Sequence, residues 1–568
     1  MSKYNRKKEE VKPTVKNFMN EDAFLLKPKE EFVSSIMTTF LSNEGSYYES
    51  SNEEVKRILS LLDKIDPLFA CKAAIYVREN GNMRSISHLL GAALANYISG
   101  QEYAKRFYNK LIVRPDDMSE IVSAYANLNG MGLNDVKKIP NSMKKGFKEA
   151  LEGLDAYRID KYKMKTRSFS LVDLVRLFHP KATQKNAEAY KRLIEGKSLA
   201  DLYSSKILEK EMTKAGQKTK DMTEKDKVEA KKEAITAVID NVKGMPVMNL
   251  LRNLRNILLY APDKVTEACE QLIIKDKIMN SRLLPFRFAT AYPEIEKMSY
   301  YTEISSTKSS IQFEDEKSSS LCSENEFRRN KEMVLNAIEK ALEISCLNIP
   351  KLEGNVAILV DDSGSMRGDA GGSSRVSAFS KTSTSMIAHL FASMVMYRQD
   401  NVYLGLFGDK LINVPVKRDM RLLDYTKWTF EKGGECGGAT ETGIYDFIRQ
   451  VVKEKKKIDN VIVFSDCQIG SIHTKGYYGG YSEFTAWYGN NSSDRGKHFH
   501  ELFKEFRKIN PNANFIVVNL RQSGSTSVFD KSQRILNIAG WSDKIFDVIT
   551  SQCKGWDAMI KEIESIEI

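Results

Sequence analysis

The sequence has few of the features that mark secreted, disulfide-bonded or membrane proteins. Its seven cysteines in 568 residues are scattered, with no C-x-x-C pair and an odd count, which indicates reduced thiols rather than a disulfide framework. No apolar run approaches the length that spans a bilayer. The charged start, MSKYNRKKEEVK, lacks the apolar core of a signal peptide. We therefore expect a soluble, cytoplasmic protein without membrane contact.

The excess of charge of one sign is also small. Lys and Arg number 86 against 75 Asp and Glu, and the formal net charge of +11 is modest for this length. Only local clusters of charge can therefore indicate a binding partner. The chain is longer than a single hydrophobic core supports and 42% of its residues are hydrophobic, so we expect at least two well-packed domains.

The first part of the chain has helical patterns and few convincing strands. From about Lys27 to about Glu296, apolar residues recur at three- and four-residue steps, as in EEFVSSIMTTFL and MNLLRNLRNILLY. Consecutive helices with short connections are typical of an α-solenoid of helix pairs. We predict a charged tail at 1–20 and a helical domain at 21–345 with a Ser-rich loop at 303–326. The charged segment 210–234 is either an exposed helix or a disordered insertion.

The second part alternates between strands and helices. From Gly354 onward the predicted strands are NVAILVD, NVYLGLFG, NVIVFSD and NFIVVNL, separated by amphipathic helices. Nearly unbroken apolar strands indicate a parallel sheet with helices on both faces, so we predict a doubly wound α/β domain at 346–568. Such sheets bind ligands at the carboxyl ends of their strands.

Small oxygen donors gather at those predicted strand ends. They form D-x-S-x-S after the first strand, a threonine before a helix and an aspartate after a later strand. These residues are Asp361, Ser363, Ser365, Thr440 and Asp466. Carboxylates and hydroxyls without His or thiolate suit a hard divalent cation, above all Mg²⁺, rather than zinc. Thr442 could take the place of Thr440, and a polar turn that binds nothing is the alternative.

An aromatic and glycine-rich segment, KGYYGGYSEFTAWYGNN, follows at 475–491. It could cover the predicted metal, stack on a partner or form a surface loop.

A basic segment lies in the helical part, at 156–185. Within AYRIDKYKMKTRSFSLVDLVRLFHPKATQK only Asp160 and Asp173 oppose the cations. SLVD predicts a helix capped by Ser170 that stops at His179, because Pro180 disfavours helical geometry before it. Such a segment suits phosphate contacts and base stacking, although a solvated charged face is the alternative.

Five motifs occur in a fixed order along the helical part: FLSNEGSYYES, FACKAAIYVRENGNMRSISHLLGAAL, AYRIDKYKMKTRSFSLVDLVRLFHPK, GMPVMNLLRNL and SRLLPFRFATAY. They resemble the TROVE family, which comprises the Ro ribonucleoprotein autoantigen and its bacterial relatives. The resemblance covers nearly the whole chain after the first twenty residues. Residues from about Leu352 to Ile568 resemble a von Willebrand factor A domain with a metal-ion-dependent adhesion site.

The resemblance implies a ring of HEAT-like helical repeats closed by the von Willebrand-type domain. It implies a monomeric, non-catalytic RNA-binding protein that holds small structured Y RNAs and single-stranded ends of misfolded RNAs. A role in RNA quality control and a 3′ exoribonuclease partner are part of the same expectation. The five oxygen-donor residues would then be the metal shell.

The resemblance also assigns RNA-binding residues. The basic segment supplies Lys161, Lys163, Arg167, Arg176, His179 and Lys181. The motif MRSISH supplies Arg84, Ser85, Ser87 and His88 as residues lining the ring. Phe169 stands where the family usually has Trp, and we expect it to pack in the same way.

Two other classes of function stay open. A metal-dependent protein-interaction scaffold would use the adhesion-type site to grip proteins. A metal-dependent hydrolase is disfavoured, because the sequence has no evident nucleophile–base pair and too few carboxylates for a two-metal site.

Overall fold

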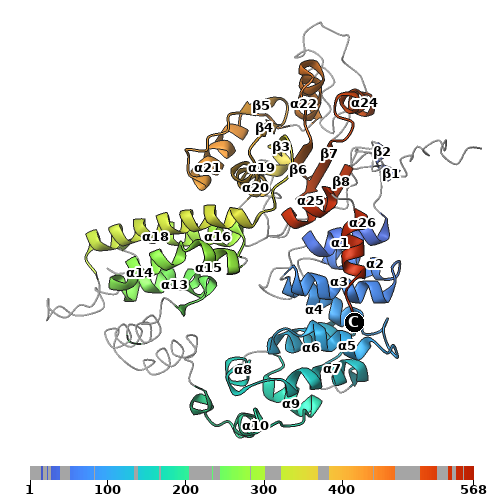
Figure 1. The fold of residues 1–568 in the computed structure, drawn as a ribbon, viewed down its shortest axis with the longest axis vertical. Helices are drawn as coiled ribbons and strands as arrows, with labels where there is room; N and C mark the ends of the chain where they lie inside the picture. The colour runs from blue at the N-terminus through green and yellow to red at the C-terminus, as the bar shows by residue number, and fades with distance from the viewer. Residues whose placement is uncertain are drawn as a thin grey trace, which may run out of the picture.

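The computed structural model describes residues 15–16, 22–23, 27–38, 52–81, 83–132, 138–164, 168–203, 233, 244–281, 283–300, 322–368, 383–438, 441–466, 499–520, 535–539, 545–553 and 556–568. These residues form an arc of helices and an α/β part that lies between the two ends of the arc (Figure 1). The predicted two-part fold is thus confirmed. Within these ranges, no helix combines the length and apolar character needed to cross a membrane.

Helices that follow one another along the chain form the arc. Its first section contains α1 (Pro28–Thr38), α2 (Asn52–Leu62), α3 (Pro67–Glu79), α4 (Arg84–Ala93), α5 (Ala104–Leu111), α6 (Pro115–Leu128), α7 (Asn141–Glu152), α8 (Ala156–Lys161), α9 (Leu171–Phe178) and α10 (Ala187–Ile194). Its second section contains α13 (Val247–Tyr260), α14 (Val265–Leu272), α15 (Lys275–Ser281), α16 (Pro285–Glu296) and α18 (Glu324–Ser345). A two-stranded antiparallel pair, β1 (Val15–Lys16) and β2 (Asp22–Ala23), precedes them.

Local capping signals fix several helix ends. The Asp66 side chain accepts a hydrogen bond from Phe69 N at the start of α3, where Pro67 takes the first helical position. Ser170 and Asp173 form the predicted capping box of α9. That helix ends at Phe178, and His179 follows as its C-cap in the left-handed region, at φ 47°. Ser323 caps α18, so this helix begins at Glu324, inside the predicted Ser-rich loop 303–326.

Residues 303–321 of that loop, most of the 1–20 tail and 210–234 segment, and all of 475–491 lie outside the described residues. The domain boundary between residues 345 and 346 stays a prediction.

A six-stranded sheet forms the centre of the α/β part, in the order β5-β4-β3-β6-β7-β8. Its strands are β3 (Val356–Asp361), β4 (Val402–Phe407), β5 (Leu411–Val414), β6 (Asn460–Ser465), β7 (Asn514–Asn519) and β8 (Ile535–Ala539). All neighbours are parallel except β4 and β5. The four predicted strands are β3, β4, β6 and β7. The sequence analysis missed β5 and β8, which are short strands at the two edges.

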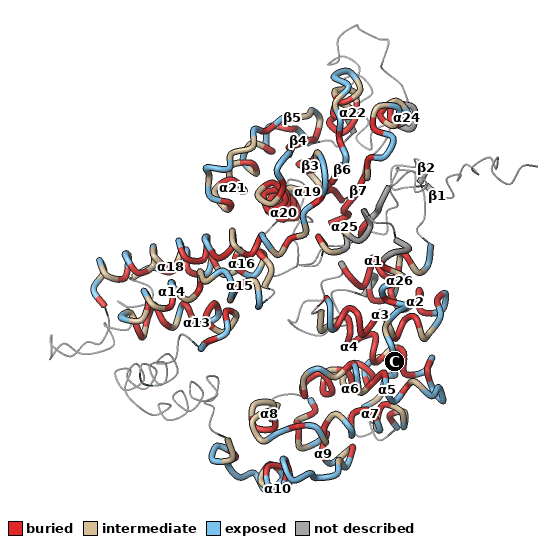
Figure 2. Tube along the Cα trace, viewed as in Figure 1, coloured by how far each residue is buried: buried red, intermediate tan, exposed pale blue. Residues whose placement is uncertain are grey.

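Helices cover both faces of this sheet, as its apolar strands predict. The helices of the α/β part are α19 (Gly364–Arg367), α20 (Thr384–Arg398), α21 (Leu422–Gly433), α22 (Glu441–Glu454), α24 (Phe499–Ile509), α25 (Ile545–Cys553) and α26 (Trp556–Glu564). Along β3, Ile358 and Val360 join a buried cluster with α20 and α25, whereas Ala357 and Leu359 join a second cluster with α22 and α24. Figure 2 shows how fully α20 is buried.

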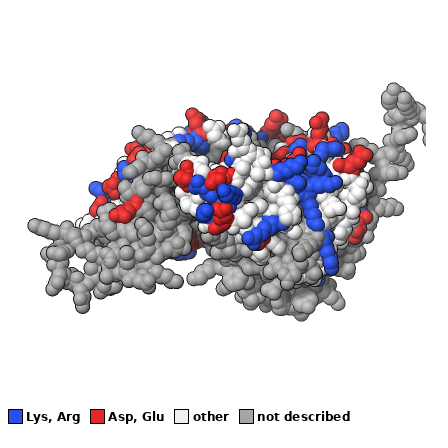
Figure 3. Space-filling view, turned by 90° about the horizontal axis from the view of Figure 1, so that it is seen from below, with Lys and Arg blue, Asp and Glu red and all other residues white. Residues whose placement is uncertain are grey.

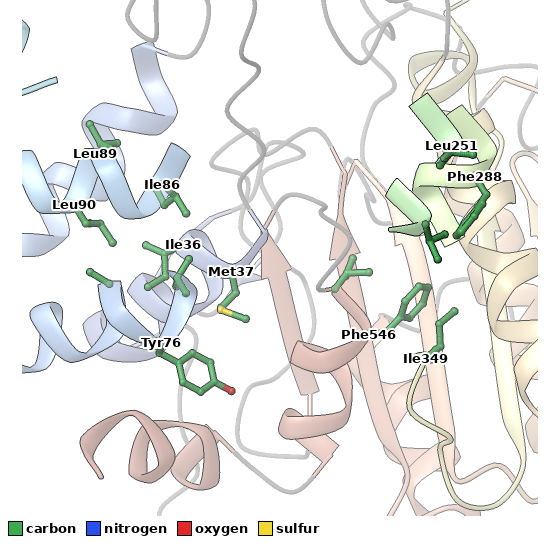
Figure 4. Close-up of a cluster of buried hydrophobic side chains, with 14 of the residues drawn as sticks. Ile36, Met37, Tyr76, Ile86, Leu89, Leu90, Leu251, Phe288, Ile349 and Phe546 are labelled. Atoms are coloured by element: carbon green, nitrogen blue, oxygen red, sulfur yellow. The ribbon is translucent and has the colours of Figure 1, made fainter. Parts of the chain in front are cut away.

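One hydrophobic core runs through both parts of the molecule. The cluster that includes one face of the sheet also includes the interior of the helical arc. Figure 4 shows a section of it, from Ile36 and Met37 of α1 through Phe546 of α25 to Phe288 of α16. At the end of the chain, α26 packs against α3 and α1, with Ile563 fully buried. The C-terminal helix therefore joins the α/β part to the first helices.

Replacement of Ile563 by Ala should weaken this junction. Removing a fully buried isoleucine side chain costs about 2–5 kcal/mol, so we expect a clearly lower unfolding midpoint in urea. The neighbouring Lys561 is exposed, and Lys561→Ala should leave the midpoint nearly unchanged. Equal midpoints for the two variants would show that the packing of α26 on α3 and α1 adds little to the stability of the fold.

Candidate metal site and candidate nucleic-acid interface

The two predicted metal-site aspartates meet at the carboxyl ends of neighbouring strands. Asp361 is the last residue of β3, and Asp466 directly follows β6, the strand paired with β3 in parallel. Both carboxylates are fully buried. The parallel sheet therefore brings these residues together although they lie far apart in the sequence.

Hydroxyl groups and main-chain amides surround Asp361. One carboxylate oxygen accepts a hydrogen bond from Ser363 N at 2.9 Å, and the other accepts one from the Ser465 hydroxyl at 2.6 Å. The hydroxyls of Ser363 and Ser365 lie 3.1 Å apart. Gly364 N donates to Gly438 O at 3.0 Å, which holds the chain just before Thr440 against the D-x-S-x-S turn. Thr440 and the side chain of Thr442 lie outside the described residues.

Within the described residues, the Asp361 carboxylate has hydrogen-bond partners but no cationic one. Burial, together with the nearby charge of Asp466, raises the pKa of Asp361 to about 8. No Lys or Arg of the described residues forms an ion pair with Asp361. In the same ranges no three His, Cys, Asp or Glu side chains form a metal cluster, so a cation here would need the serine hydroxyls as ligands. Carboxylates and hydroxyls are ligands that fit Mg²⁺.

The side chain of the next residue, Asp362, has a different set of partners, and these balance its charge. Its carboxylate accepts hydrogen bonds from Arg367, Ser385 and His389 at 2.7–3.0 Å. Burial alone would raise the pKa of Asp362, but these contacts, with His389 first, lower it. Asp362 therefore anchors α19 and α20 beneath the turn.

His389 also links Asp362 to Thr429, in a chain that resembles a hydrolase triad. His389 Nδ1 lies 3.0 Å from the Thr429 hydroxyl, and Nε2 contacts the Asp362 carboxylate. The exposed fractions of Asp362, His389 and Thr429 are 1%, 0% and 1%. A substrate cannot reach the hydroxyl, so this network is structural.

In the helical part, Arg84 and His88 belong to a buried ion cluster around Asp117. The Asp117 carboxylate accepts hydrogen bonds from Arg78 at 2.8 Å and Arg84 at 3.1 Å, and lies 2.8 Å from His88 Nε2. It also accepts from the main-chain N–H groups of Val113 and Arg114 at the start of α6. The cluster thus joins α3, α4 and α6.

This cluster leaves the predicted ring-lining residues with unequal exposure. The His88 side chain is 3% exposed and Ser87 is buried, whereas the Arg84 side chain is 32% exposed and Ser85 is half-buried. Arg84 also forms an ion pair with Asp116 at 2.7 Å. Contact of these residues with RNA stays a prediction.

The cations of the basic segment fall into two groups. Lys163 forms an ion pair with the buried Asp160 at 2.8 Å. In the described part of the chain, Lys161, Arg176 and Lys181 form no ion pair with a carboxylate, and Arg176, His179 and Lys181 are exposed. Arg167 lies outside the described residues. Phe169 is buried, as expected.

The structure adds three residues that the sequence analysis did not single out: Arg114, Tyr157 and Tyr162. Arg114 pairs with Asp116 at 3.0 Å and lies over the Tyr162 ring, 5.0 Å from its centroid. The Lys161 amino group lies 5.5 Å from the Tyr157 centroid and 5.9 Å from the Tyr162 centroid. Because Asp116 also pairs with Arg84, the MRSISH motif and the basic segment meet at this point. Only the alternation of Tyr and Lys in AYRIDKYK could have suggested these contacts.

A family model for the TROVE domain matches residues 20–239 and 227–354, together more than half of the chain. The chain belongs to the TROVE-domain family. Its fold is similar to the crystal structure of the Deinococcus radiodurans RO (RSR) protein, with a TM-score of 0.57 and 14% identity, over 93% of this chain and 99% of that one.

The chain also matches short stretches of two curated relatives named telomerase protein component 1. The Rattus norvegicus protein is 20% identical over 152 residues, which are 25% of this chain and 6% of the relative. The Mus musculus protein is 20% identical over 141 residues, or 24% and 5%. This chain thus spans a small fraction of the length of those relatives.

Replacement of Asp117 by Asn should test the ion cluster of the TROVE part. Burial would raise the pKa of Asp117, but the contacts with His88 and Arg78 outweigh it and hold that pKa well below its usual range. The variant leaves Arg78 buried without its partner, so we expect a loss of about 3–5 kcal/mol near neutral pH.

The loss of stability in Asp117→Asn should become smaller as the pH falls. A carboxylate with a lowered folded-state pKa stabilises the fold above its unfolded pKa of about 3.9, and this contribution disappears as the pH falls below that value. The difference between the unfolding midpoints of the natural protein and Asp117→Asn should therefore be constant above about pH 5 and narrow below about pH 4. Glu149→Gln, in an exposed pair with Lys105, is the control. A difference that grows with acidity would contradict this account.

Proposed function

We propose that this protein is a non-catalytic RNA-binding component of a ribonucleoprotein. In this proposal it acts in the cytoplasm, holds small structured Y-like RNAs and the single-stranded 3′ ends of misfolded RNAs, and serves RNA quality control or tethers a 3′ exoribonuclease. Membership of the TROVE family supports the RNA-binding role. The observation that carries the proposal is the set of cations without a carboxylate partner in the described chain, Lys161, Arg176 and Lys181.

Charge on the surface is consistent with this role. Figure 3 views the lower end of the molecule in Figure 1, and Lys and Arg form a continuous band on one side of it. Phosphates bind such local basic surfaces without an extreme overall charge, and the affinity then falls steeply with salt. The exposed Arg176 and His179 at the end of α9 suit contacts with phosphate and base.

We also propose that the α/β part is a von Willebrand factor A domain whose strand ends bind Mg²⁺. Asp361, Ser363, Ser365 and Asp466 would hold the ion, together with Thr440 or Thr442. The burial of two neighbouring carboxylates supports this assignment. A bound ion would supply positive charge with open positions for a carboxylate or phosphate of a partner. Under the alternative function, a protein-interaction scaffold, this site would be the main binding surface.

The proposed RNA interface predicts that an Arg176→Ala, His179→Ser variant has a lower affinity for RNA, and that this affinity depends less on salt. RNA that copurifies with the natural protein would be sequenced and titrated back over a salt series. We expect weaker binding and a shallower salt dependence, because one phosphate contact is removed. Arg328→Ala, an exposed arginine on α18, is the matched control. If the Arg176→Ala, His179→Ser variant binds RNA like the natural protein, or if no RNA copurifies, the protein-interaction scaffold is favoured.

The metal site predicts a separate result for Asp361→Ala. Mg²⁺ should raise the unfolding midpoint of the natural protein. At a free Mg²⁺ concentration one hundred times the dissociation constant, the free energy of unfolding should rise by about 2.7 kcal/mol. The variant should lose this response and keep its RNA affinity. A response retained by the variant would place the ion elsewhere, and a loss of RNA affinity would show that the two parts do not bind independently.

A further inference from the structure

Arg114, Tyr162, Lys161 and Tyr157 form one strip of alternating cations and aromatic rings, here called the Arg–Tyr strip. Arg114 lies over Tyr162, and Lys161 lies over both Tyr162 and Tyr157, with cation-to-centroid distances of 5.0–5.9 Å. Both rings and Lys161 are half-buried, and the Arg114 side chain is 42% exposed. Figure 1 shows that α8, which carries Tyr157 and Lys161, lies on the concave side of the helical arc.

Contacts with Asp116 and Tyr203 hold the Arg–Tyr strip in place. Asp116 fixes Arg114 through two hydrogen bonds of 3.0 Å, and Arg84 pairs with the same carboxylate. Tyr203 packs edge-on against Tyr157 at 5.4 Å, and its hydroxyl donates to Asp160. The rings therefore do not have to be ordered when a ligand arrives, which favours binding.

Lys161 is the most weakly held cation of the strip. Its amino group contacts the two rings and lies 3.4 Å from the Tyr157 hydroxyl, and within the described residues it forms no ion pair with a carboxylate. Ring contacts of a cation at a partly exposed position are worth about 0.5–1 kcal/mol, and the hydrogen bond to the Tyr157 hydroxyl is long, at 3.4 Å. An incoming phosphate can therefore attract Lys161 away from the rings and leave a face of Tyr157 or Tyr162 for a base.

We infer that the Arg–Tyr strip binds the unpaired bases of single-stranded RNA by stacking. Phosphates would contact Lys161 and Arg114, while bases stack on Tyr162 and Tyr157. Duplex RNA keeps its bases inside, so it cannot use the rings. Stacking accepts every base, so the strip would select unpaired strands rather than a sequence. This inference rests on the proposed RNA-binding function and adds the group that recognises the bases.

The test compares a short oligouridine with an abasic strand of equal length and charge, using the full-length protein. Tyr162→Leu should weaken oligouridine binding by about 10-fold, within the range known for one stacked base, and leave the abasic strand unaffected. Tyr162→Phe keeps the ring and should bind both strands like the natural protein. Lys161→Gln should weaken both strands, because both carry phosphates.

Each result decides a different point. A loss confined to the base-bearing strand supports stacking, whereas an equal loss on both strands, or none, overturns it. If the natural protein binds neither strand, the RNA-binding proposal fails as well. An acidic peptide that binds with the same dependence on Tyr162 would make the strip a peptide site and overturn the inference. Tyr157→Leu gives a second reading should Tyr162→Leu lower the unfolding midpoint.

Discussion

Packing of the last helix against the first helices is the contact on which the whole arrangement depends. A succession of helix pairs has two open ends, and nothing within the pairs themselves brings those ends together. Here α26 returns to α3 and α1 with Met559 and Ile563 buried. Lys72 donates to the main-chain oxygen of Glu564, the last residue of that helix, where cations are favourable, and Lys110 donates to that of Glu567 just beyond it. This junction joins the α/β part to the start of the arc whose concave side carries α8.

The cations of the helical part serve two purposes, and burial decides which. Asp117 is fully buried and would be costly to ionise alone, so Arg78 and Arg84 are committed to it. Arg84 then orders Arg114 through Asp116 and acts as a positioning residue. Lys161 and Arg176 are not required for any such pairing in the described chain, which leaves them for a ligand. Of the cations on this basic surface, only those that are not paired with a buried aspartate are available to bind phosphate.

The sequence predicts best what depends on neighbouring residues. The apolar run of β3 and the Ser170–Asp173 capping box are local patterns, and both are found. The meeting of Asp361 and Asp466 follows from one general rule, that parallel strands end at the same edge. The short edge strands β5 and β8 give no clear pattern, because few residues define them. The contact of Arg114 with Tyr162 joins two separate segments, and no periodicity announces it.

Three buried aspartates show how this fold handles a charge that water cannot reach. Asp117 is compensated by Arg78 and Arg84, and Asp362 by Arg367 together with His389. Among the described residues, Asp361 accepts hydrogen bonds from a main-chain N–H and from serine side chains but forms no ion pair, and it lies near a second carboxylate. Dipoles of this kind cannot balance a full charge at low dielectric. A proton, or a cation bound at this edge of the sheet, would balance the charge, and this is the physical reason for the proposal of a Mg²⁺ site there.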